Sequence, residues 1–451
     1  MKQLPYGIAD FKAIQTENFY FVDKTKFIVE LENAGRHLIF LRPRRFGKSL
    51  WIAILEAYYD LYYKSEFKAI FKDTWIFNHR TAEASSYHIL RLDFSAIEVS
   101  RAEKSFSEYL YIILHAFINR YKIDVPCNSE NPISMLNQIF AYVKAHQLNL
   151  YILIDEYDNF ANKLFLQDKT LYKDIVSDKS AFFKQFFTTL KTGTGGNDAP
   201  VKRMFITGVT PMTLFDVTSG FNIGKNISLD ATFNAMVGIT ETELEQMYNH
   251  YGIVPDAQQR HLVKEWYDRY RFSEDREETV YNTDMILYYL DPVIKKGHPP
   301  RELIDINVRS DYRKLRHLIY TNHRLNGNFE LLKQLIGGNA ITTDALVQDF
   351  SAFNLTKEEN FKSLLFYQGL ITIKDARLKL SLQIPNETIK RIDIDFLKDS
   401  LELEDVFALK TAKLSDLLAG FATEGSLEVF EYLADEIKRN TAIRDYILKV
   451  G

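Results

Sequence analysis

Cysteine is almost absent from this chain, which has a single one, Cys127, among 451 residues. A lone cysteine cannot form an internal disulfide or a cysteine-based metal cluster, and the ten histidines show no metal-ligand spacing. No run approaches the roughly 18 apolar residues of a membrane span, and the N-terminus MKQLPYGIADF lacks the apolar core of a secretion signal. These absences argue against disulfide-stapled, metal-cluster and membrane proteins, and we expect a cytoplasmic protein.

An excess of charge of one sign is also lacking. The chain has 56 Lys and Arg against 60 Asp and Glu, a net charge of -4 and a pI near 6.2, so no overall attraction to nucleic acid or anionic membrane is expected. Hydrophobic residues at 46% and charged residues at 26% are typical of globular proteins. At about 150 residues per domain, the length predicts two or three domains.

A phosphate-binding loop is indicated by residues 37–50, which read HLIFLRPRRFGKSL. An apolar run precedes a short basic turn, and Gly47-Lys48-Ser49 then opens an amphipathic stretch. Such a turn between a strand and a helix leaves backbone N–H groups at the helix N-terminus, where they and the helix dipole attract phosphate oxygens. Lys48 would reach the β- and γ-phosphates, and Ser49 would hold Mg²⁺.

The loop departs from the usual G-x-x-x-x-G-K-[ST] pattern, because Arg42 stands where the first glycine is expected. Arg42, Arg44 and Arg45 add positive charge where a triphosphate would sit, so guanidinium contacts are expected to hold the anion together with backbone amides. The alternative interpretation is a solvated basic turn before an ordinary helix.

A second motif ends another apolar run. Residues 148–158 read LNLYILIDEYD, and a short apolar run of this kind is typical of a strand buried on both faces in a parallel sheet. Asp155 and Glu156 follow it at the C-terminal end, where ligands bind in such sheets. Asp155 would belong to the Mg²⁺ shell, and Glu156 would act as the general base on the attacking water. The alternative is a strand followed by an acidic turn.

Together the two motifs predict a nucleotide site. The predicted contacts to ATP and to Mg²⁺ include Ser49 and Asp155, which serve both. The full set of predicted binding residues is Arg44, Arg45, Phe46, Gly47, Lys48, Ser49, Leu50 and Asp155.

Further strands are predicted at 88–94 and 201–209. One strand thus lies between the loop strand and the acidic strand along the chain, as in the additional-strand branch of P-loop ATPases. Residues 18–31 are candidates to wall the base pocket. Thr207 and Thr210, at the end of the fourth strand, are candidate γ-phosphate sensors and Thr207 a candidate catalytic residue, with ordinary turn threonines as the alternative.

Beyond this core, assigned to residues 1–237, the pattern becomes helical. Thr240 and Glu243 form a capping box that opens a predicted helical lid at 238–298. Arg271 is the candidate lid arginine that reaches the phosphates; the alternative is a packed hairpin with satisfied arginines.

Residues 299–392 are predicted to form helices and a winged-helix-like module, in which a helix, a Gly369 cap and a two-stranded hairpin turning near Asp375 follow one another. Residues 393–451 are predicted to be a helical segment. Basic residues near the hairpin leave DNA binding open as a function of this module: Lys362, Lys374, Arg377 and Lys379.

The chain resembles the AAA-ATPase-like family of Bacteroidetes, whose members pair a P-loop ATPase with a C-terminal nuclease-like domain of the PD-(D/E)XK type. The resemblance depends on many short segments in the same order: LPYGIADF, YFVDKT, RPRRFGKSL, LDFS, LIDEYDNF, ITGVTPMTLFDVTSGFN, VGITETEL, WYDRYRFS, VYNTDMILYYL, SLLFYQGLITI and LQIPN. It implies nucleotide roles for Lys48, Ser49, Asp155 and Glu156. It also implies that an arginine at position 42 is normal.

The sequence therefore predicts an α/β fold, a P-loop NTPase with a mostly parallel sheet flanked by helices, followed by a helical lid and a winged-helix-like module. The expected function is a Mg²⁺-dependent, ATP-hydrolysing switch whose catalytic residues are Glu156, Lys48, Thr207 and Arg271. No nuclease activity is expected, because the chain stops near the point where the nuclease-like domain would begin. The alternatives are a nucleotide-holding scaffold with little turnover that acts through a partner, and the DNA-binding protein. A protein partner or a homo-oligomer is possible, and ATP is preferred over GTP only through the resemblance.

Overall fold

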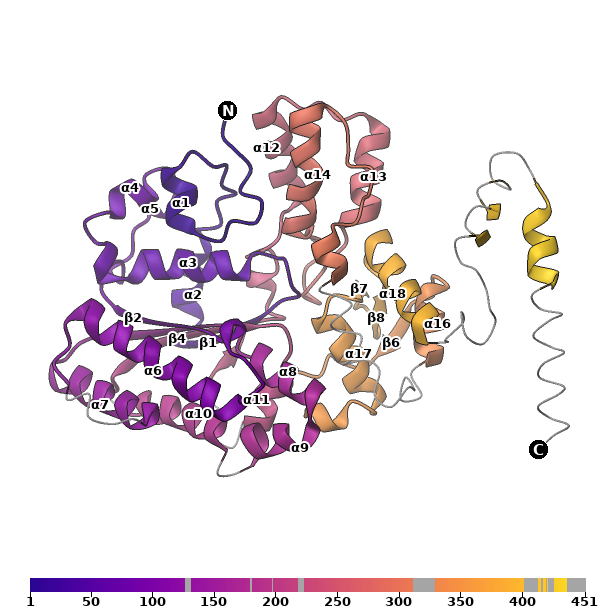
Figure 1. Ribbon diagram of the computed structural model, residues 1–451. Helices are drawn as coiled ribbons and strands as arrows, with labels where there is room; N and C mark the ends of the chain where they lie inside the picture. Colours follow the sequence, from indigo (N-terminus) through magenta and orange to yellow (C-terminus); the bar gives the residue numbers. More distant parts are fainter. Residues whose placement is uncertain are drawn as a thin grey trace, which may run out of the picture.

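A computed structural model describes residues 1–125, 131–178, 181–196, 198–217, 223–310 and 329–400, with short pieces at 413–414, 417–418, 420 and 426–435 (Figure 1). Cys127 and most of the predicted helical segment 393–451 lie outside the described residues. In the described part of the chain, no helix is long and apolar enough to cross a membrane.

A five-stranded sheet, parallel throughout, forms the centre of the N-terminal half. Its order is β2-β3-β4-β1-β5, so β4 lies between the strand of the loop, β1, and the acidic strand, β3. Every residue of β3 is buried, as its unbroken apolar run predicts. The strands span His37–Leu41 (β1), His88–Asp93 (β2), Leu150–Asp155 (β3), Val201–Gly208 (β4) and Lys225–Asn226 (β5).

Helices cover both faces of this sheet, and the predicted α/β class is confirmed (Figure 1). Helix α3, Lys48–Tyr59, starts at the loop and packs against β2 and β3. On its side of the sheet lie α1 (Phe11–Thr16), α2 (Phe27–Ala34), α4 (Phe67–Phe71) and α5 (Trp75–Asn78). On the other side lie α6 (Ala102–Tyr121), α7 (Pro132–Ala145), α8 (Asn159–Gln167), α9 (Lys169–Tyr172), α10 (Phe182–Gly193) and α11 (Met212–Val217).

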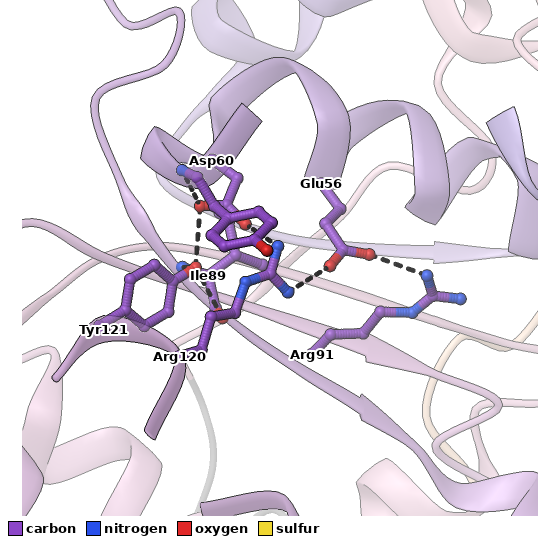
Figure 2. Close-up of polar contacts among 7 residues, drawn as sticks. Glu56, Asp60, Ile89, Arg91, Arg120 and Tyr121 are labelled. Atoms are coloured by element: carbon purple, nitrogen blue, oxygen red, sulfur yellow. Dashed lines mark hydrogen bonds and ion pairs between the residues drawn. The ribbon is translucent and has the colours of Figure 1, made fainter. Parts of the chain in front are cut away.

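A polar cluster fixes the C-terminal end of α3 to the edge of the sheet (Figure 2). Glu56 accepts hydrogen bonds from Arg91 at 2.9 Å and from Arg120 at 3.2 Å. Arg120 also donates to the fully buried Asp60 at 2.6 Å. Burial raises the pKa of Asp60, and the charge of Arg120 only partly offsets this. The cluster therefore holds the end of α3 that lies farthest from the predicted phosphate site.

Tyrosine hydroxyls from α6 cover the open edge of β2. The Tyr121 hydroxyl accepts the N–H of Ile89 at 2.9 Å, and the Tyr109 hydroxyl accepts the N–H of Asp93 at 2.6 Å (Figure 2 shows the first). An edge strand otherwise presents free N–H groups to other chains. These two bonds block pairing at that edge.

The helical lid consists of α12 (Glu241–Tyr251), α13 (Ala257–Tyr267) and α14 (Thr283–Lys296). The predicted capping box is present, because Thr240 accepts the N–H of Glu243 and Glu243 accepts the N–H of Thr240. Helix α14 ends before Gly297, whose φ of 76° is left-handed.

The winged-helix-like module is confirmed by its topology: a helix, a strand, a second helix and an antiparallel hairpin. The prediction of two strands was incomplete, because β6 joins the hairpin in the order β6-β8-β7. Gly369 has a φ of 77° after the central helix α17, as a helix cap requires. The elements are α16 (Phe329–Ile336), β6 (Ile341–Thr343), α17 (Glu358–Tyr367), β7 (Thr372–Asp375), β8 (Leu380–Gln383) and α18 (Glu387–Ser400).

Short 3₁₀-helices lie at η1 (Leu61–Tyr63), η2 (Phe94–Ala96), η4 (Ala231–Phe233) and η5 (Ala352–Asn354), and a short π-helix at η3 (Lys173–Ser177).

Candidate functional site

The turn between β1 and α3 has the geometry of a phosphate loop. Gly47 precedes the first residue of α3 and has a φ of 98°, a left-handed conformation that glycine adopts without strain. Arg45 also has a positive φ, 70°, which is uncommon for a residue with a side chain. The sequence pattern thus folds locally into a tight, partly strained loop that opens onto a helix N-terminus.

The two predicted motifs meet at one edge of the sheet. The Lys48 ammonium group lies 3.9 Å from Glu156 Oε1 and donates to the carbonyl of Pro43 at 3.0 Å. The Ser49 hydroxyl lies beside the Asp155 carboxylate and favours its ionised form, which opposes the larger effect of burial on the pKa of Asp155. The loop and the acidic strand are brought together although β4 separates β1 from β3.

Asp155 is 1% exposed, and its Oδ1 has no hydrogen-bond partner among the described residues. Burial raises its pKa to about 6, with the Glu156 charge in the same direction, while the Ser49 hydroxyl and the charge of Lys48 oppose the shift. A buried acceptor without a partner beside a serine hydroxyl fits a divalent cation, which prefers oxygen ligands and would favour the ionised carboxylate. Mg²⁺ usually takes only one or two protein ligands and completes its shell with phosphates and water.

Glu156 is held in a left-handed conformation, with a φ of 52°. Its Oε2 accepts a 2.9 Å hydrogen bond from the side-chain amide of Asn159, and Lys48 lies near its other oxygen. Burial would raise the pKa of Glu156, but the charge of Lys48 and the bond from Asn159 outweigh it and lower the pKa. Glu156 is therefore ionised at neutral pH, as a general base must be.

Asp158 is a site residue that the sequence reasoning did not single out. Fully buried at the start of α8, it accepts from the N–H of Val209 at 3.1 Å, and from the N–H and hydroxyl of Thr210 at 2.8 and 2.9 Å. A Cβ on Gly208 would lie 2.5 Å from Asp158 Oδ1, so this close approach requires glycine. The position of Asp158 directly after Asp155 and Glu156 could have marked it as a candidate, but the sequence does not reveal that it binds Val209 and Thr210.

Thr207 lies at the end of β4, next to the DEYD turn, and its carbonyl accepts the N–H of Tyr157 at 3.1 Å. Its buried hydroxyl has no hydrogen-bond partner in the described part of the chain, and Thr207 is not among the residues that line the adjacent cavity. The hydroxyl of Thr210 is already engaged by Asp158. The structure thus places both threonines beside the acidic turn, and their role as phosphate sensors stays a prediction.

A cavity of about 500 Å³ opens on the loop. Its lining combines the loop and the acidic turn with the N-terminal segment and the lid. The segment 18–31 supplies Tyr20, Phe21, Val22 and Lys24 to the cavity lining, and its role as the wall of a base pocket stays a prediction. From the loop and the helix it opens, the lining residues are Arg44, Arg45, Phe46, Gly47, Lys48, Ser49, Leu50, Trp51 and Ile54.

Phe46 lines the cavity but points its ring into the interior. The side chain is 1% exposed and packs edge-on against Tyr270 at 4.9 Å and Phe272 at 5.3 Å, measured between ring centroids. Only its backbone is therefore suited to a nucleotide contact.

The expectation that Arg42 adds charge at the phosphates is wrong. Its guanidinium is buried and donates to the carbonyls of Leu41, Ser228 and Phe233 at 2.9, 2.6 and 3.0 Å. The rings of Phe40 and Phe272 lie over it, 4.4 and 4.3 Å from its central carbon. Burial lowers the pKa of Arg42 to about 9. Arg42, which stands in place of the first glycine, thus donates to backbone carbonyls in the protein interior. Arg44 and Arg45 line the cavity.

The structure does not bring Arg271 to the cavity. Its guanidinium donates to the carbonyls of Ser273 and Glu274 in its own loop, at 3.0 and 2.6 Å, and its backbone N–H donates to the Thr372 hydroxyl of β7. The alternative of a satisfied arginine in a packed loop describes this geometry.

The winged-helix-like module packs its central helix inward. Phe366 of α17 lies edge-on to Phe272, with ring centroids 6.1 Å apart. Lys362, one of the basic residues that left DNA binding open, is buried and donates to the carbonyl of Thr342 at 2.7 Å, so its side chain is not presented to DNA. Arg377 and Lys379 are exposed and paired with Asp375 and Asp344.

Comparisons with known proteins agree with the loop geometry. Residues 5–218 match the AAA-ATPase-like family, described as a predicted AAA-ATPase, and over this part of the chain the resemblance seen in the sequence is confirmed. An uncharacterized protein in the vnfD 5′ region of Azotobacter chroococcum mcd 1 is 24% identical over 408 residues, which cover 86% of this chain and 68% of that protein. The family match and the loop geometry support nucleotide binding.

Three solved structures match this chain at low similarity. The Aeropyrum pernix ORC2 protein in ADPNP–ADP complexes has a TM-score of 0.41 at 11% identity, with 87% of this chain and 98% of that chain covered. Cdc6p from Pyrobaculum aerophilum has a TM-score of 0.30 at 10% identity, covering 83% and 92%. The Aeropyrum pernix ORC1 protein in complex with DNA has a TM-score of 0.29 at 11% identity, covering 87% and 90%.

Proposed function

We propose that the protein binds ATP with Mg²⁺ in the cavity beside the loop and hydrolyses it. The observation that carries the proposal is the pairing of Ser49 with Asp155 and of Lys48 with Glu156 at a single edge of the sheet. Two motifs more than 100 residues apart in the sequence meet there, next to a cavity of about 500 Å³. Such a volume suits a small-molecule site.

In this proposal, Lys48 offsets the negative charge of the β- and γ-phosphates, and Arg44 and Arg45 add charge from the same loop. Ser49 and Asp155 hold the metal, which when bound neutralises charge on the phosphates. Glu156 accepts a proton from water as the water oxygen bonds to the γ-phosphorus. The bond from that phosphorus to the bridging oxygen breaks, and ADP and inorganic phosphate leave.

Positioning and electrostatic stabilisation supply most of the rate in this chemistry. The left-handed backbone of Glu156 and its bond from Asn159 fix the position of the base. We therefore expect loss of Glu156 to reduce turnover far more than binding, and loss of Lys48 to reduce both.

The test is ATP binding and phosphate release by the wild type, Lys48→Ala and Glu156→Gln. Lys104→Ala and Glu108→Gln are matched controls, because these residues form an exposed ion pair on α6 away from the cavity. Turnover that falls about 100-fold or more in both site variants, and stays unchanged in both controls, would support the proposal. Wild-type levels of phosphate release in Lys48→Ala and Glu156→Gln would refute it.

A scaffold that holds nucleotide with little turnover is the second candidate. It is favoured by the engagement of both Glu156 oxygens, one near Lys48 and the other bonded to Asn159, which leaves the base less available to water. Single-turnover hydrolysis decides between the two, because a scaffold retains bound ATP for much longer than a switch does.

DNA binding through the winged-helix-like module is disfavoured. The helix that would enter a DNA groove, α17, is buried along most of its length. Absence of salt-dependent DNA affinity at low ionic strength would end this alternative.

A further inference from the structure

The N-terminus of the lid helix α14 is hydrogen-bonded to the phosphate loop between β1 and α3. Three consecutive loop carbonyls accept hydrogen bonds from three consecutive residues at this helix end. Asn282 donates its side-chain amide to the carbonyl of Arg44 at 3.3 Å, and Thr283 donates its hydroxyl to that of Phe46 at 3.0 Å. The N–H of residue 284 donates to the carbonyl of Arg45 at 3.3 Å. The shape of the loop and the position of the lid are thus coupled by direct bonds.

One ion pair joins the same two elements inside the cavity. Arg45 donates to Asp284 Oδ2 at 2.9 Å, and both residues are among those that line the cavity. The side chains are 34% and 17% exposed, so the pair is only partly screened by solvent. A carboxylate at this position is unexpected for a site that receives a polyanion, because it repels phosphate and occupies an arginine that phosphate would use.

We propose that Asp284 is a stand-in anion that holds Arg45 until nucleotide phosphates displace it, and that this exchange loosens α14 from the loop. The inference rests on the proposed ATP-binding function and adds its regulation. Phosphate carries more charge than a carboxylate and can accept two parallel hydrogen bonds from a guanidinium group. Asp284, once released, remains in the first turn of α14, where the helix dipole favours a negative charge.

The proposal predicts that a loss of charge improves binding. Asp284→Asn removes both the competitor for Arg45 and a repulsive charge, while the backbone bond to the loop remains possible. We expect ATP to bind about three- to tenfold more tightly to this variant, which corresponds to about 0.7–1.4 kcal/mol. A purely structural role for the pair predicts the opposite sign, because breaking it would disorder the loop and weaken binding.

The experiment measures the dissociation constants of ATP and of adenosine for the wild type, Asp284→Asn, Arg45→Ala and the double variant. Asp291→Asn is the matched control, since it removes the same charge from the same helix at an exposed ion pair with Lys295. The expected result is a gain for ATP in Asp284→Asn that is absent for adenosine, absent in Asp291→Asn and abolished when Arg45 is also replaced. ATP affinity equal to or weaker than that of the wild type in Asp284→Asn overturns the proposal.

Amide hydrogen exchange of the unaltered protein gives a second test that needs no variant. Faster exchange in the first turns of α14 upon ATP addition supports displacement of Asp284, and unchanged or slower exchange there overturns it. Failure of the wild type to bind ATP at all would instead refute the proposed function, which the same titration detects first.

Discussion

Replacement of Asp158 provides the sharpest test of how the site is assembled. In Asp158→Ala, the N–H groups of Val209 and Thr210 and the Thr210 hydroxyl lose their shared acceptor in a fully buried position. Each buried donor left unpaired costs about 1–3 kcal/mol. Allowing for partial access of water, we expect a loss of about 3–6 kcal/mol, and a fall in Tm of about 2–4 °C for each kcal/mol.

Asp158→Asn is expected to lower the free energy of unfolding by less than Asp158→Ala does. Burial raises the pKa of Asp158, with the charge of Glu156 in the same direction, so the ionised group is itself expensive to bury. The amide removes this charge and keeps one acceptor oxygen. The order of stability should therefore be wild type, then Asn, then Ala.

Activity should fall together with stability, because Asp158 ties the turn that carries Glu156 to the end of β4. The assays are thermal unfolding and steady-state phosphate release at a temperature where all variants are folded. Glu108→Ala, at an exposed position on α6, controls for the loss of a carboxylate. A Tm of Asp158→Ala within about 1 °C of the wild type would refute the reasoning, because it would mean that losing the carboxylate leaves no buried donor unpaired.

Three further predictions follow from individual residues. Gly47→Ala forces a side chain into a φ of 98°, at a cost of about 1–2 kcal/mol, and should weaken ATP binding measured by titration; unchanged affinity would show that the loop does not need this conformation. Arg42→Met should lower the Tm by about 4–8 °C through about 2 kcal/mol of lost bonds to three carbonyls, while the dissociation constant of ATP changes little; a large loss of affinity with unchanged Tm would contradict the buried position of Arg42. Burial would raise the pKa of Glu83, but the hydrogen bond from Arg203 and its charge outweigh burial and lower this pKa. The ionised carboxylate therefore stabilises the fold above its ordinary pKa of 4.5, and this stabilisation is lost as the pH falls through the lower pKa of the folded state. Glu83→Gln should therefore flatten the fall in Tm as the pH drops below 4.5, and an unaltered acid profile would argue against the pair.

The strands and the local structure of the loop could be predicted from the sequence, because their signals are local. An unbroken apolar run suits a strand buried on both faces, and β3 is buried at every residue. Gly47 and the residues after it define a turn and a helix start by their own conformational preferences. Asp155 and Glu156 follow the run directly, so their place at the strand end needed no tertiary information. Their nucleotide roles stay predictions.

Side-chain direction was decided only by the tertiary structure. Arg42, Arg44 and Arg45 lie within four residues of one another, and the sequence offers no reason to treat them differently. Arg42 enters the interior because it contacts the carbonyls of Ser228 and Phe233 and the ring of Phe272 there. These partners lie about 190 or more residues further along the sequence. In the same way, Asp158 acquires its role from the two residues that follow β4, about 50 residues further on.

The lid and the winged-helix-like module also combine features that local sequence predicts with features that only tertiary packing decides. The capping box of Thr240 and Glu243 fixes where α12 begins, since a cap is made by residues three apart. No local pattern, however, predicts that Arg271 bonds its own loop, that α17 is packed inward, or that Asp284 meets Arg45. A charge in a sequence reveals its sign, whereas its partner depends on which distant segments the packed core brings beside it.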